Sequence, residues 1–278
     1  MMVVSAVLIA IAAWWISTGL VIMIVRRTGG HQLALALSSV TALGGLIAIW
    51  FSRDMVTPTG IYLGFFGALA LWAWHEVTFL TGKIVGPRRM GLSASVEAGT
   101  RFRQAFLAIR DHELALFATG LLLVVAFAGS ANPTGWLIYS LMWVMRLSTK
   151  LNVFFGAPNA VSEILPARLA YLTSYFRTDR THSIFIVSIA LITALMTGFV
   201  FFAAQSSGAE AIIWTLLASF SALALLEHLF LVLPVRDAAL WWWAVGTKNN
   251  SGAVVPAHLK KKQEGKAAGL VKFAEVGS

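Results

Sequence analysis

Three pairs of adjacent acidic and histidine residues lie in or beside hydrophobic segments of this chain: His75 with Glu76, His112 with Glu113, and Glu227 with His228. A charged side chain inside or at the edge of the hydrocarbon layer is costly, so it usually has a partner and often marks a functional site. Neutral imidazole can ligate the metal of a chlorin or haem. We therefore predict a site built from these pairs, with Glu163 and His182 in a nearby connecting loop.

A second interpretation treats the same residues as structural. Arg146 lies inside a hydrophobic segment and could neutralise Glu76 or Glu227, and buried ion pairs of this kind fix how helices pack. Adjacent residues on a helix point about 100° apart, so each pair can direct only one member to the centre of a bundle. The sequence leaves open whether His75, His112 and His228 bind a cofactor or only pack.

A metal site is the third interpretation. Its carboxylate ligands would be Glu76, Glu113, Glu163 and Glu227. Di-iron sites in helix bundles normally use Glu-x-x-His, which occurs in none of these segments. The chain also has no cysteine, which excludes thiolate ligands and disulfides. Ser-His-Asp arrangements and phosphate-binding glycine loops are not recognisable, so no catalytic residue is assigned.

The composition indicates the environment of these residues. Of 278 residues, 58% are hydrophobic and 12% are charged, whereas about a quarter of the residues in soluble proteins are charged. A helix needs about 20 apolar residues to cross a bilayer. Seven segments meet that length, at about 3–25, 32–51, 60–82, 113–131, 134–155, 183–204 and 211–233. Continuous apolar runs such as 121–127 lack the alternation of a barrel strand. We therefore predict an all-α integral membrane protein, a bundle of seven transmembrane helices.

The distribution of basic residues predicts the orientation of this bundle. In the predicted topology Arg53 is the one basic residue of 21 on the opposite side from the rest. The positive-inside rule then places the N-terminus outside and the C-terminus in the cytoplasm. The net charge of +9 is explained by this topology and by contact with anionic lipids, so no nucleic-acid partner is expected.

The long inner loops contain two segments with helical, amphipathic spacing, 93–110 and 165–177. Apolar residues share one face and arginines can reach lipid headgroups, which is typical of interfacial helices. The final residues, 247–278, are rich in lysine and glycine and predict a flexible basic cytoplasmic tail. We expect residues 1–246 to form a single seven-helix domain.

A series of short motifs resembles a known family. In order, these motifs are His75-Glu-x-x-Phe-Leu-x-Gly82, Gly86-Pro-Arg-Arg89, His112-Glu-Leu114, Lys150-Leu-Asn-Val-Phe-Phe-Gly156, Pro158-Asn159, Glu163-x-Leu-Pro166, Tyr171-Leu-x-Ser-Tyr-Phe176 and Glu227-His-x-Phe-Leu-Val-Leu-Pro234. Each motif is weak alone, but the ordered series is similar to the PuhE family of photosynthetic complex assembly proteins in purple phototrophic bacteria. The resemblance covers about residues 5–246.

The resemblance implies a protein of the cytoplasmic, or intracytoplasmic photosynthetic, membrane. Its expected partners are reaction-centre or light-harvesting subunits and other assembly factors, and its expected role is complex assembly or bacteriochlorophyll supply. A pigment-handling role would give the histidines a function, because His75, His112 or His228 could ligate the magnesium of bacteriochlorophyll or a precursor.

Two alternatives to the assembly role come from different functional classes. The first is a membrane metal-dependent oxidoreductase of bacteriochlorophyll biosynthesis, with a non-haem iron held by His and Glu at the cytoplasmic face. The second is a small-molecule transporter, which is disfavoured because the sequence shows little sign of an inverted repeat.

Overall fold

A computed structural model describes residues 2–27, 31–93, 98–160, 165–235 and 240–245. Glu163 and the predicted tail at 247–278 lie outside these residues. Within the described part every regular element is helical, which confirms the all-α prediction. The elements are α1 (Met2–Arg27), α2 (His31–Ser52), α3 (Pro58–Leu80), α4 (Ala98–Phe127), α5 (Thr134–Phe155), the 3₁₀ helix η1 (Ala167–Tyr175), α6 (Ile184–Gln205), α7 (Gly208–Phe230) and α8 (Trp242–Val245).

Five of the described helices, α1, α2, α3, α6 and α7, are long and apolar enough to cross a membrane. The helices α4 and α5 occupy the other two predicted spans. They are less apolar, since α4 carries charges throughout its first half and α5 contains Arg146 and Lys150. The protein is therefore a multi-pass membrane protein, and the count of seven spans and the orientation of the termini stay predictions.

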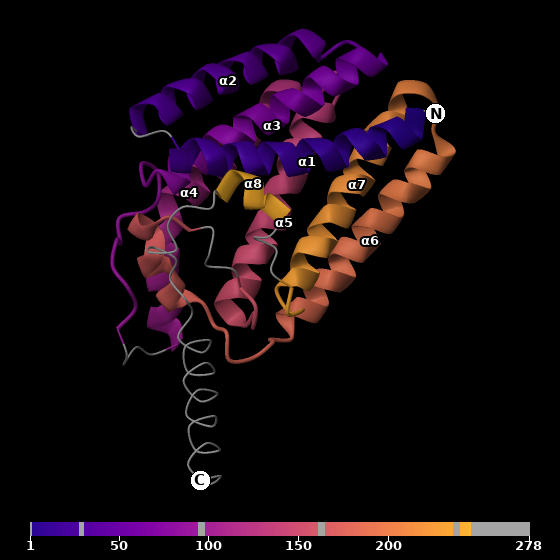
Figure 1. Cartoon of the computed structure of the whole chain (residues 1–278). Helices are drawn as coiled ribbons and strands as arrows, with labels where there is room; N and C mark the ends of the chain where they lie inside the picture. The colour runs from indigo at the N-terminus through magenta and orange to yellow at the C-terminus, as the bar shows by residue number, and fades with distance from the viewer. Residues whose placement is uncertain (1, 28–30, 94–97, 161–164, 236–239, 246–278) are drawn as a thin grey trace, which may run out of the picture.

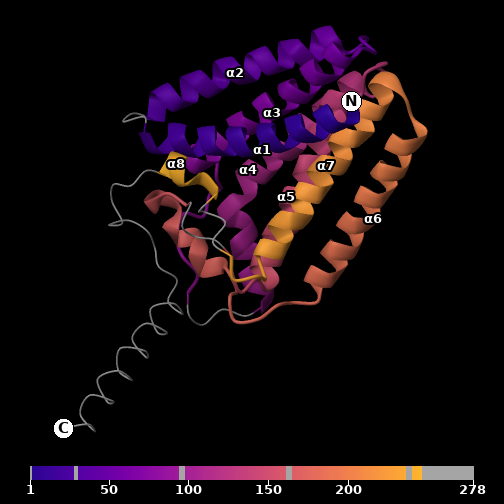
Figure 2. The same ribbon diagram turned by 45° about the vertical axis from the view of Figure 1, so that its right-hand side comes forward.

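The helices form two groups that cross at a steep angle (Figures 1 and 2). In one group α2 packs along α3, with α1 running in a similar direction; in the other, α6 and α7 form an antiparallel pair. Contacts of α7 with α1 and α3 join the two groups, and α5 packs against both α3 and α7 and also against α4. Thus α1, α3, α5 and α7 are central, whereas α2 and α6 are peripheral.

The peripheral position of α6 agrees with its side-chain exposure. Ile186, Val187 and Leu191 are among its exposed apolar residues, and its described buried residues are Ser188 and Ile192. An apolar helix surface of this kind is suited to contact with lipid, because the hydrocarbon chains offer no hydrogen-bond partners to a helix.

Local sequence defines the ends of α3, which carries the first acid–histidine pair. The Thr57 hydroxyl accepts a hydrogen bond from the Gly60 amide at 3.2 Å, and Pro58 follows in the first turn. A threonine cap followed by proline is a strong helix start. At the other end Gly82 has a φ of 74°, a left-handed conformation that glycine adopts at low cost.

Small residues bring α2 and α3 close together. A Cβ added to Gly45 would lie 2.7 Å from the carbonyl oxygen of Gly67, and one added to Gly67 would lie 2.8 Å from Ile49. Glycines at such a contact let membrane helices pack backbone to backbone. This contact sets the position of α3 against the peripheral α2.

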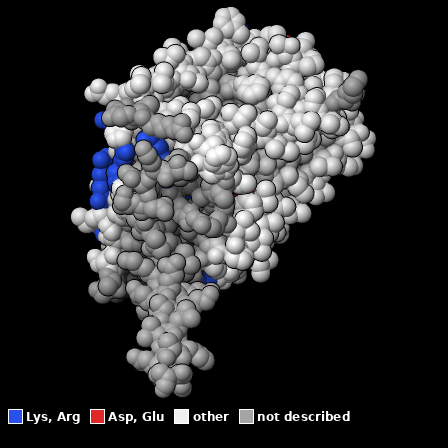
Figure 3. Space-filling view, viewed as in Figure 1, with Lys and Arg blue, Asp and Glu red and all other residues white. Residues whose placement is uncertain are grey.

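Basic residues gather at one end of the molecule. Figure 3 shows Lys and Arg near the place where α1 ends and α2 begins, while the other described residues visible in that view are almost all uncharged. Two arginines connect η1 to its neighbours. Arg101 on α4 donates to the carbonyl oxygens of Phe154 on α5 and Tyr175 on η1, and Arg88 donates to the Tyr175 hydroxyl at 2.8 Å. The predicted amphipathic segment 93–110 is continuous with α4 from Ala98 onward, and its place at a membrane surface stays a prediction.

Candidate functional site

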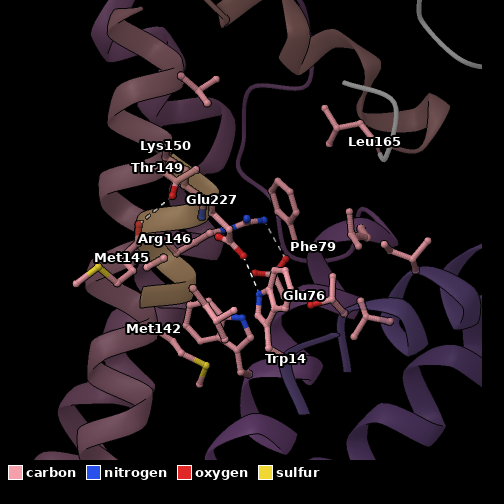
Figure 4. A pocket seen from close by; sticks show the side chains of 18 of the residues that line it. Trp14, Glu76, Phe79, Met142, Met145, Arg146, Thr149, Lys150, Leu165 and Glu227 are labelled. Atoms are coloured by element: carbon pink, nitrogen blue, oxygen red, sulfur yellow. Dashed lines mark hydrogen bonds and ion pairs between the residues drawn. The ribbon is translucent and has the colours of Figure 1, made fainter. Parts of the chain in front are cut away.

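The central helices line a partly open cavity of about 420 Å³. Residues from α1, α3, α4, α5 and α7 line it, and η1 contributes Leu172 and Tyr175. Most of the lining is apolar, and Figure 4 shows aromatic and aliphatic side chains around a small polar centre. Cavities of roughly 300–1,000 Å³ with apolar walls and few polar groups are typical of small-molecule sites.

The polar centre joins four helices, α1, α3, α5 and α7. Arg146 on α5 contacts Glu76 on α3, with 3.3 Å between Nη2 and Oε2. On α7, Glu227 accepts a hydrogen bond from the Trp14 indole nitrogen at 2.8 Å. Figure 4 shows these side chains pointing toward one another across the cavity. The structure thus brings together the predicted ion-pairing arginine and two of the four glutamates.

A second ion pair lies on the same helix as Arg146. Lys150, one turn further along α5, is paired with Glu113 on α4. Lys150 also lines the cavity and lies 5.8 Å from the centre of the Phe79 ring. Three carboxylates and two cations from α3, α4, α5 and α7 thus lie together. We call them the charge cluster: Glu76, Glu113, Arg146, Lys150 and Glu227.

In two of the three pairs the glutamate lines the cavity and the histidine does not. His75 is buried between α3 and α4, where Nε2 lies 3.1 Å from the Thr119 hydroxyl. His228 is buried between α7 and α5, with Nε2 at 2.9 Å from the Ser148 hydroxyl and Nδ1 at 2.8 Å from the Ala224 carbonyl oxygen. The difference of about 100° between adjacent helical residues explains why glutamate and histidine point apart.

His112 is packed without a hydrogen bond. Its ring centre lies 4.5 Å from that of Phe79 and 6.5 Å from that of His75. Neither ring nitrogen has a partner among the described residues, and the side chain is buried. His75, His112 and His228 are therefore set into helix contacts, and a role for any of them as a pigment ligand stays a prediction.

The metal-binding alternative needs several ligands at one point. Among the described residues, no group of three or more His, Asp and Glu side chains is close enough to hold a metal ion. Glu163 lies outside that part of the chain. His182 is not among the residues that line the cavity; its ring lies 5.2 Å from that of Phe155, and its Nδ1 accepts from the Ile184 amide at 3.2 Å.

Two tryptophans contribute to the site without having been predicted. Trp14 donates to Glu227. Trp241 packs edge-on against Trp14, with 5.3 Å between the two ring centres. Trp241 also lines the cavity and donates to the Trp15 carbonyl oxygen at 2.9 Å. No short-range signal pairs Trp14 with Glu227, because 213 positions separate them.

Fold and site together define a multi-pass, all-helical membrane protein with an apolar internal cavity that contains a charge cluster. The chain belongs to the family described as proteins of unknown function, DUF3623, whose profile matches residues 1–252. It is 34% identical over 243 residues to a Rhodobacter capsulatus protein described as an uncharacterized 30.4 kDa protein in the puhA 5′ region. The alignment covers 85% of this chain and 88% of that relative. No solved structure matches the chain.

Proposed function

We propose that the protein is an assembly factor of the photosynthetic membrane, which assists reaction-centre and light-harvesting complex assembly or the supply of bacteriochlorophyll to it. The observation that carries this proposal is the relative in the puhA 5′ region, which hints at a photosynthesis-related role. The resemblance of the ordered motifs to the PuhE family supports the same role. The five apolar helices support action within the membrane.

The geometry of the site is suited to binding. The polar groups of the charge cluster are mostly paired with one another, and the surrounding walls are apolar. Such a cavity can hold an apolar group while the buried pairs keep the helices in register. This arrangement fits a protein that receives a pigment or a subunit helix.

The basic end of the molecule fits a cytoplasmic contact. By the positive-inside rule, we assign the end that carries Arg88, Arg89 and Arg101 to the cytoplasmic face. Anionic lipids attract such clusters, and reaction-centre or light-harvesting subunits and other assembly factors are the proposed protein partners there.

The test is a deletion of the gene in its phototrophic host, followed by complementation with the full chain. Near-infrared absorption of isolated membranes, normalised to membrane protein, measures reaction-centre and antenna complexes. We expect the deletion to lower these complexes and the intact gene to restore them. Unchanged complex levels and an unchanged rate of complex appearance after a shift to phototrophic growth would overturn the proposal.

A further inference from the structure

Arg146 exposes donor groups to the cavity. Its side chain is 39% exposed, against 13% for its partner Glu76, although both lie in the central helices. Arginine has five N–H donors and no acceptor. The hydrogen bond described for Arg146 uses Nη2 alone, and the exposed end of the guanidinium keeps further N–H groups. Nε also has no partner among the described residues, but it is buried and does not face a ligand. A ligand in the cavity would therefore meet a guanidinium with unused donors.

Several neighbouring groups are already engaged. Oε2 of Glu76 is paired with Arg146, Oε1 of Glu227 accepts from Trp14, and Lys150 is paired with Glu113. Oε1 of Glu76 has no partner among the described residues but is itself buried, so the exposed part of the guanidinium is the donor that a ligand in the cavity meets. A hydrogen-bond acceptor on the ligand complements it directly.

The pairing within the cluster selects among acceptors. The cluster contains three carboxyl groups and two basic side chains, and each basic side chain is already paired with a carboxylate. A carboxylate or phosphate headgroup would add like charge in a poorly screened, apolar setting, where such repulsion is strong. An uncharged acceptor, such as a carbonyl oxygen, avoids this cost.

We infer that the cavity binds an uncharged lipophilic molecule that bears a carbonyl group, such as an ester, a ketone or a quinone. Its carbonyl oxygen accepts from Arg146, and its apolar body lies against walls that include Trp14, Trp72 and Phe220. The volume of about 420 Å³ accommodates a substantial part of such a molecule. This inference does not depend on the assembly role, so the two can fail separately.

Photo-crosslinking of the purified full chain tests the ligand class. Three probes carry the same diazirine-tagged long alkyl chain: a methyl ester, a free carboxylic acid and an ether without a carbonyl. We expect the ester to label peptides of α1, α3, α5 and α7 at the cavity, and the acid and the ether to label them less. Equal labelling by the acid or by the ether would overturn the inference.

Competition distinguishes the natural sources of this chemistry. Excess short-tailed benzoquinone and excess methyl ester of a chlorin are each added before illumination. Suppression of ester labelling by the quinone alone indicates a membrane quinone, suppression by the chlorin ester alone indicates a pigment, and suppression by both indicates a site for the shared carbonyl chemistry. No suppression by either compound would contradict a saturable carbonyl site.

Cavity-filling variants test the location. Ala73 on α3 lines the cavity, whereas Ala204 on α6 is exposed and lies outside it. We expect Ala73→Phe to lower ester labelling at least about tenfold, which corresponds to a loss of about 1.4 kcal/mol, and Ala204→Phe to leave it unchanged. Ala224→Leu, from the α7 side of the cavity, is the second variant if Ala73→Phe does not fold. Equal labelling of the folded cavity variant and the control would contradict the inference.

Discussion

The indole nitrogen of Trp14 donates to Oε1 of Glu227 over 2.8 Å, and this hydrogen bond joins the first and last long helices of the structure. Further contacts between α1 and α7 accompany it. A hydrogen bond to a carboxylate contributes about 1.5–3 kcal/mol, more than a neutral one. The bond therefore fixes both the helix contact and the direction of Glu227 into the cavity.

Trp14→Phe should destabilise the protein by about 1.5–3 kcal/mol through loss of this bond. Trp74→Phe is the matched control, since Trp74 donates to the neutral Ser39 hydroxyl at an exposed position, and it should cost less. Unfolding in mixed micelles measures both. In a cycle with Glu227→Gln, the double variant should show a coupling energy; additive effects would show that the two side chains do not interact in the folded protein.

Arg146→Ala should destabilise the protein because it leaves Glu76 without its cation. The pair is only partly buried, so the cost should lie below the roughly 3–5 kcal/mol of a fully buried pair. The double variant Arg146→Ala with Glu76→Gln removes the stranded charge and should recover part of the loss. The same unfolding assay checks this order. A double variant as unstable as the single one would mean that Arg146 packs as an apolar stem and its charge contributes little.

Glu227 and His228 are adjacent in sequence but should differ in their effects. Glu227 lines the cavity, whereas His228 is held between helices by Ser148 and the Ala224 carbonyl. At matched protein abundance, Glu227→Gln should lower photosynthetic complex yield, and His228→Gln should act through protein stability instead. Quantitative immunoblots with membrane absorption spectra separate the two effects. A yield loss confined to His228→Gln would instead support a ligand role for the histidine.

The orientation can be tested with reporter fusions. Alkaline phosphatase is active only outside the cytoplasm, and the loop at Arg53 is the predicted outer loop that carries a basic residue. A fusion after Asp54 should be active and a fusion after Arg89 inactive. The reverse pattern would place the basic end of the molecule outside and contradict the proposed cytoplasmic contact.

Hydropathy predicted the positions of the helices closely because apolar length is a strong signal. The expected segments 134–155 and 183–204 correspond to Thr134–Phe155 and Ile184–Gln205. The start of α4 is earlier than the apolar segment at 113–131, because the amphipathic residues before it continue the same helix from Ala98.

The site was less predictable, for a geometric reason. Helical spacing predicts that Glu76 and His75 point apart, but the packing of α3 against α4 and α5 decides which of them lines the cavity. The sequence also cannot predict the partner of Glu227, since Trp14 is 213 positions away. A tryptophan in an apolar segment is normally expected at the membrane–water interface.

If this membrane protein supports photosynthetic complex assembly through its cavity, filling the cavity should abolish that support. The most direct measurement is the near-infrared absorption of membranes from the deletion strain, complemented with Ala73→Phe or with Ala204→Phe at equal protein abundance. We expect the exposed α6 variant to restore the complexes and the cavity variant to leave them low. Equal restoration by both variants, or normal complexes without any complementation, would contradict it.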